Sequence, residues 1–69
     1  MTEIRIKDEF IKLGQAMKLC GAVDSGVEAK LVIQDGKVKV NGEVCISRGK
    51  KLISGDHFEY KKESYLIVT

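Results

Sequence analysis

The sequence contains no proline and no tryptophan, and its only aromatic residues are Phe10, Phe58, Tyr60 and Tyr65. A core with so few rings must be built mainly from isoleucine, valine and leucine. The 69 residues also lie near the lower size limit for a chain that folds around its own core. We therefore expect a single small domain over residues 1–69, with modest stability.

Long apolar runs and metal-ligand clusters are also absent. No apolar run approaches the length of a membrane span, and the polar start Met1-Thr2-Glu3 is not typical of a signal peptide, so we expect a cytoplasmic protein without a membrane partner. Cys20 and Cys45 are far apart and are expected to remain thiols. Together with the single histidine, His57, they cannot supply a closed zinc site, so no metal and no cofactor is expected.

The sequence also offers no recognisable catalytic constellation. His57 follows Asp56, but no nucleophile with a matched base and no phosphate-binding glycine loop can be assembled from these residues. We therefore expect His57 to be structural and the protein not to be an enzyme.

Basic residues are present and are unevenly distributed. The net charge is only +2, but between Lys30 and Lys51 six basic residues stand against Asp35 and Glu43. The local field, rather than the total charge, determines attraction to phosphate. This segment is therefore the predicted site of contact with a polyanion.

The N-terminal third predicts a strand followed by a helix. Polar and apolar residues alternate over Thr2–Lys7, which indicates a strand with its isoleucines facing inward. Asp8 can start a first helix that stops at Gly21, and Gly14 inside it would permit close approach of a neighbouring element. The apolar residues at helical spacing on its expected inner face are Phe10, Leu13, Met17 and Cys20.

Ser25 and Glu28 form a capping box at the start of a second helix, which is expected to end at Gly36. The Ser25 hydroxyl is expected to accept the Glu28 N–H, and the Glu28 carboxylate to accept the Ser25 N–H. Ala29, Val32 and Ile33 form the expected core face. Val27 and Leu31 lie opposite; we expect the first strand or the C-terminal tail to cover them, and the alternative is an exposed patch for a partner.

The second half predicts two hairpins. Lys37–Val40 alternates with its valines inward, Asn41-Gly42 favours a type I′ turn, and Glu43–Ile46 is the expected return strand. Residues 47–51 form a basic loop anchored by residues 52–53, and the last hairpin joins residues 57–60 to 65–68 around residues 61–64. The predicted fold class is α+β, with two short helices packed on a small, mostly antiparallel sheet of about four to five strands.

Residues Ser25–Gly42, with the later Gly55-Asp56, resemble the S-four RNA-binding domain, the alpha-L motif named after small-subunit ribosomal protein S-four. The resemblance covers about residues 12–60. The stretch Arg48–Leu52 is similar to the small stand-alone bacterial subgroup of YbcJ-like proteins. The resemblance implies binding of structured RNA, such as ribosomal or transfer RNA, with RNA contacts at Lys12, Gln15, Lys30 and Lys39.

One residue departs from the family pattern: Gly26 occupies a position where arginine is common, which removes one phosphate contact at the helix start. Bare amides at this helix start can still receive an anion. The charge pattern adds basic residues of the hairpin, the loop and the first helix to the expected contacts. The complete set of expected RNA-binding residues is Lys12, Gln15, Lys18, Lys30, Lys37, Lys39, Arg48, Lys50 and Lys51. We expect a monomer whose partner is structured RNA or a ribosomal particle. One alternative is a protein-interaction adaptor that docks on a ribosome-associated factor through Val27, Leu31 and the exposed hairpin. The other is that the charges merely solvate the sheet.

Overall fold

A computed structural model describes all residues, 1–69. Seven short strands and two helices follow one another along the chain. Their bounds are β1 (Thr2–Arg5), β2 (Ile11–Lys12), α1 (Leu13–Leu19), α2 (Gly26–Gln34), β3 (Val38–Val40), β4 (Glu43–Val44), β5 (Lys51–Leu52), β6 (His57–Tyr60) and β7 (Glu63–Val68). The predicted α+β class is therefore confirmed.

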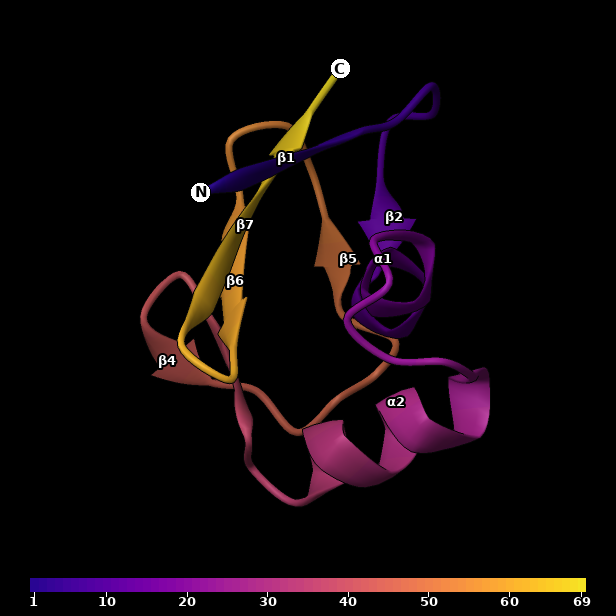
Figure 1. Ribbon diagram of the computed structural model, residues 1–69. Helices are drawn as coiled ribbons and strands as arrows, with labels where there is room; N and C mark the ends of the chain where they lie inside the picture. The colour runs from indigo at the N-terminus through magenta and orange to yellow at the C-terminus, as the bar shows by residue number, and fades with distance from the viewer.

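Five of the strands form one mixed sheet in the order β1-β7-β6-β3-β4. All its pairings are antiparallel except β1 with β7, which run parallel in a register that pairs Thr2 with Tyr65 and Arg5 with Val68. Strands β2 and β5 form a separate two-stranded ribbon. Both helices lie on one side of the large sheet, and the ribbon lies beside α1 (Figure 1).

The core fills the space between the helices and the sheet. Alternating residues of β3 and β6, such as Val38 and Phe58, point toward the helices and are buried, as are Leu13 and Ile33 on the helices. Ile4 and Ile6 are buried as predicted. Neither helix has the length and apolar character that crossing a membrane would require.

The first helix begins later than the sequence predicted. Helix α1 starts at Leu13 rather than at Asp8, because Ile11 and Lys12 are extended and pair with Leu52 and Lys51 in the ribbon. Phe10 consequently lies outside the helix and is 38% exposed instead of facing the core. The predicted stop is confirmed, since Gly21 follows the helix with a positive φ of 79°.

The capping residue of α2 is predicted correctly, but its reciprocal contact differs by one residue. The Ser25 hydroxyl accepts a hydrogen bond from the Glu28 N–H at 3.1 Å. The Glu28 carboxylate accepts from the Asp24 N–H at 2.9 Å, not from the Ser25 N–H. Ala29 and Ile33 are buried as expected.

The outer face of α2 is uncovered, contrary to the expectation. Val27 is 69% exposed and Leu31 is 60% exposed. Strand β1 pairs with β7 at the far edge of the sheet, so neither it nor the tail reaches this helix face.

The hairpins form with two differences from the prediction. Asn41 and Gly42 make the expected turn, with φ values of 51° and 87°, but the return strand is limited to Glu43–Val44. The last hairpin turns at Lys61 and Lys62, with φ values of 53° and 68°, so its loop has two residues rather than four. Asn and Gly adopt such angles readily and lysine seldom does, which is why the sequence located the first turn by residue and the second only within residues 61–64.

Candidate nucleic-acid interface

A polar groove of about 350 Å³ lies beside the first turns of α1. No apolar side chain and no carboxylate lines it. Its walls come from α1 and the residue before it, from the first residue of α2, and from the loop between β4 and β5. The lining residues are Lys12, Gly14, Gln15, Lys18, Gly26, Arg48 and Gly49.

Backbone hydrogen bonds hold the basic loop against the start of α1. The Leu13 N–H donates to the Lys50 carbonyl at 2.8 Å, and the Gly14 N–H donates to the Arg48 carbonyl at 3.0 Å. These N–H groups belong to the first turn of the helix, where no intrahelical acceptor exists. A Cβ added at Gly14 would lie 3.5 Å from the Arg48 Cβ, which confirms the predicted close approach at this glycine.

The N-terminus of α2 forms another part of the groove. Gly26 lines it, and neither the Gly26 N–H nor the Val27 N–H has a hydrogen-bond acceptor in the structure, whereas the Glu28 N–H is taken by Ser25. Free amides and the helix dipole both favour an anion at such an end. Gly26 therefore leaves a bare, partly positive helix end.

The cations of the groove are not neutralised by carboxylates. The one ion pair in the structure joins Lys37 Nζ to Asp35 Oδ2 at 3.3 Å, away from the groove. Lys12, Lys18 and Arg48 are exposed and form no ion pair. They are consequently available to a ligand, and a phosphate is the chemistry that suits three cations and free amides.

The structure brings part of the expected set together. Lys12, Gln15, Lys18 and Arg48 line the groove. Lys51 stands directly opposite Lys12 in the β2–β5 register, and Lys30 lies one helical turn beyond Gly26, but neither is among the lining residues. Lys50 lines a separate hollow that also contains the carboxylate-bearing Glu43.

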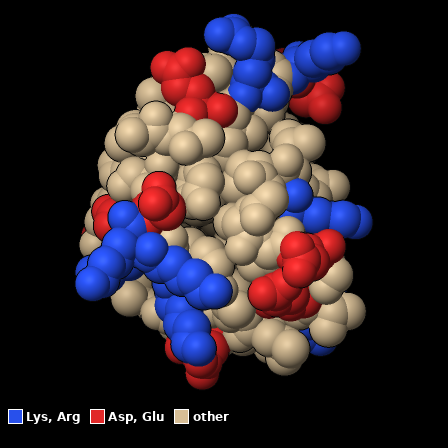
Figure 2. All heavy atoms as spheres, in the orientation of Figure 1, with Lys and Arg blue, Asp and Glu red and all other residues tan.

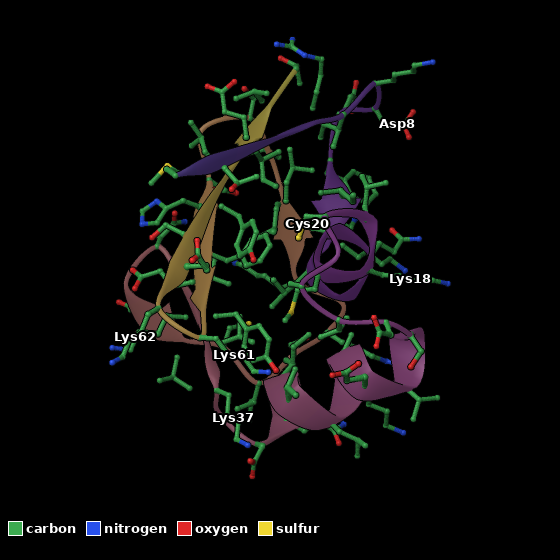
Figure 3. All side chains as sticks on the ribbon, viewed as in Figure 1. Asp8, Lys18, Cys20, Lys37, Lys61 and Lys62 are labelled. Atoms are coloured by element: carbon green, nitrogen blue, oxygen red, sulfur yellow. The ribbon has the colours of Figure 1, made fainter.

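Lys37 and Lys39 do not join this groove. Lys37 follows the C-terminal end of α2, about 13 Å along the helix from Gly26 at 1.5 Å per residue. Lys39 lies on the outer face of the sheet between Val44 and Glu59. Figure 3 shows Lys18 beside α1 on the right of the view and Lys37 near the C-terminal end of α2, and Figure 2 shows the cations of this view in separate groups with acidic residues between them. The basic segment between Lys30 and Lys51, which the sequence predicts to contact a polyanion, is therefore divided between different parts of the surface.

Sequence reasoning noted the bare amides at Gly26 and a close approach at Gly14, but it did not place the three glycines of the groove together in one site. Gly14, Gly26 and Gly49 lie between its basic side chains and supply backbone surface rather than side chains. The only signal in the sequence that could have indicated the groove is that each of these glycines stands within two residues of a basic or capping residue. That pattern is too common in sequences to specify a groove.

The shifted pKa values belong to residues outside the groove. Burial raises the pKa of the Cys20 thiol, and burial, assisted by the negative charges of Cys20 and Glu63, raises the pKa of Tyr65. Both cysteines are free thiols. Since no three His, Cys, Asp or Glu side chains cluster, the structure offers no obvious metal site.

Comparison with known proteins identifies the family. The S4 domain family matches residues 4–68, almost the entire chain. This chain belongs to the S4 domain family. It is 43% identical over 56 residues to the "Probable ribosome maturation protein RlbA" of Bacillus subtilis (strain 168), covering 81% of this chain and 79% of that protein.

A second relative, YbcJ, also has a solved structure. The "Putative RNA-binding protein YbcJ" of Escherichia coli (strain K12) is 32% identical over 62 residues, covering 90% of this chain and 89% of YbcJ. The solution structure of E. coli YbcJ, described as revealing an alphaL motif involved in RNA-binding, superimposes with a TM-score of 0.76 at 30% identity. The superposition covers 100% of this chain and 89% of the YbcJ chain, so the predicted alpha-L fold is confirmed.

Proposed function

We propose that this S4 domain binds structured RNA without catalysing a reaction, and that the groove between α1, α2 and the basic loop receives the phosphate backbone. The observation that carries this proposal is a groove with Lys12, Lys18 and Arg48 on its walls and no carboxylate among its lining residues. Two relatives have names or descriptions that refer to RNA-binding or ribosome maturation, which supports the same assignment.

The groove suits a folded RNA better than a free nucleotide. It is open and polar, its cations come from three separate segments, and Lys30 and Lys51 extend the positive surface beyond it. Recognition of helical RNA depends mainly on shape, phosphates and 2′-hydroxyls, and a surface of this kind contacts several phosphates at once.

We further propose ribosomal RNA within a maturing subunit as the natural ligand, with transfer RNA as the alternative. The relative named for ribosome maturation is the support for ribosomal RNA. Crosslinking in cells, followed by sequencing of the attached RNA, separates these two ligands. Recovery of mainly transfer RNA would overturn the ribosomal assignment and leave the groove assignment intact.

The groove assignment is tested with two triple variants that change net charge equally, from +2 to −1. The first replaces Lys12, Lys18 and Arg48 by alanine, and the second replaces Lys37, Lys39 and Lys62. At about 1 kcal/mol per phosphate contact, the groove variant should bind a ribosomal RNA fragment about 100-fold more weakly, whereas the control should bind nearly as well as the parent.

Salt titration provides an independent measure of the same contacts. Each lost phosphate contact lowers the slope of log K against log salt by about 0.9, so the groove variant should show a slope smaller by about 2 to 3. Equal affinities and equal slopes for the two triple variants would contradict the groove assignment.

The exposure of Val27 and Leu31 favours a second candidate function, docking on a protein of the ribosomal particle. These side chains are four residues apart on the outer face of α2. In a pull-down from lysate treated with nuclease, the parent would retain this partner and Leu31→Asp would lose it. A pull-down that nuclease abolishes would favour RNA as the sole partner.

A further inference from the structure

Phe10 is the aromatic residue that the core leaves out. Phe58 and Tyr60 are buried, and Tyr65 stacks on Phe58 with ring centroids 4.9 Å apart. Phe10, by contrast, is 38% exposed in the segment between β1 and β2. A chain with so few rings thus presents one of them to solvent, and that ring lies close to the proposed RNA groove.

Phe10 lines a shallow hollow of about 460 Å³ next to the groove. Gln15 lines both the hollow and the groove, so the two depressions adjoin along one side of α1. Arg5 and Lys7 add positive charge to the hollow, and the exposed Leu19 adds apolar surface. A volume of this size is within the range of pockets that hold small organic groups.

The β2–β5 ribbon aligns Phe10 with the cations of the groove. Phe10 immediately precedes β2, whose second residue is Lys12, and Ile11 between them packs partly against the core. Lys51, opposite Lys12, places its Nζ 4.8 Å from the centre of the Phe10 ring. Lys51 therefore covers one face of the Phe10 ring, and a stacked base would lie on the other face.

We propose that this hollow receives an unpaired nucleotide of the RNA bound in the groove, with its base against Phe10 and its flanking phosphates at Lys12 and Lys51. The inference rests on the proposed function and specifies its ligand: a duplex interrupted by a bulged or looped-out nucleotide. Bases extruded from a helix commonly stack on aromatic side chains.

Asp8 favours a base rather than a bare phosphate as the occupant. Its carboxylate lines the hollow, and Figure 3 shows it on the loop between β1 and β2, on the same side of the view as Lys18. A carboxylate repels phosphate, but it accepts hydrogen bonds from the amino and imino groups of a base edge. The hollow therefore has the chemistry expected of a site for a base, whereas the groove has the chemistry expected of a site for the phosphate backbone.

The test compares two RNA hairpins that differ only by one bulged nucleotide. The parent protein should bind the bulged hairpin about 5- to 150-fold more tightly than the fully paired one, the range that one stacked base contributes. Phe10→Ala and Phe10→Leu should both lose this preference while keeping the parent's affinity for the paired hairpin. The leucine variant retains apolar area without an aromatic face, so a preference preserved in it would overturn stacking.

A fluorescent variant gives a second, direct measurement. The chain has no tryptophan, so Phe10→Trp introduces a single indole. Its fluorescence should be quenched by the bulged hairpin and much less by the paired one. If both hairpins bind equally and the indole is unaffected, this inference is wrong while the proposed function stands. If neither hairpin binds the parent, the proposed function itself fails.

Discussion

Leu52 should determine whether the basic loop stays in place. Its side chain is fully buried, and its strand partner is Ile11, so it fastens the end of the loop that contains Arg48 to the start of α1. Leu→Ala substitutions at buried sites cost about 2–5 kcal/mol. A domain of 69 residues has a total stability of about 3–10 kcal/mol, at 0.05–0.15 kcal/mol per residue. Leu52→Ala should therefore remove a large part of the free energy of unfolding.

Ile53 provides a matched control, because it is the next residue and is 55% exposed. Ile53→Ala should change the free energy of unfolding by less than about 0.5 kcal/mol. Urea denaturation followed by circular dichroism measures both variants. If the two substitutions destabilise equally, the loop is not fastened through Leu52 and the reasoning fails.

A milder change separates loop release from global unfolding. Leu52→Val removes one methylene, at about 1 kcal/mol, and should leave the domain folded. The amides of Leu13 and Gly14, which donate to the Lys50 and Arg48 carbonyls, should then exchange hydrogen faster. Unchanged exchange at these two amides would mean that the loop is held independently of the Leu52 side chain.

Two further predictions concern stability. Ser25→Ala removes the hydroxyl that accepts the Glu28 N–H and should cost about 1 kcal/mol, lowering Tm by about 4–8 °C. Ser54→Ala changes an exposed serine that caps no helix, so this control should melt like the parent. Burial raises the pKa of Cys20 above 9.0 and the pKa of Tyr65 above 10.0. The folded state therefore keeps these two protons to a higher pH than the unfolded state does. The free energy of unfolding should consequently fall as the pH rises above about 9. Denaturation at pH 7 and pH 10 measures this loss, and the double variant Cys20→Ser, Tyr65→Phe should reduce it.

The sequence by itself determined the local features of this S4 domain. Ser25 caps α2, and Gly36 ends it with a φ of 77°, because only a few residue types satisfy a helix end or a left-handed backbone. The Asn41-Gly42 turn and the alternation of β3 were predictable for the same reason. Each of these features depends on residues within one turn or one strand of each other.

Only the tertiary structure decided where α1 begins and which cations meet. Ile11 and Lys12 are strand rather than helix because their hydrogen-bond partners come from β5, far along the sequence, and helical periodicity in the N-terminal segment contains no information about that partner. The same pairing exposes Phe10 and sets Lys51 beside Lys12. Lys37 pairs with Asp35, whereas Arg48 lines the groove. Counting charged residues along the sequence cannot distinguish these two cations, because their positions in space depend on the path of the whole chain.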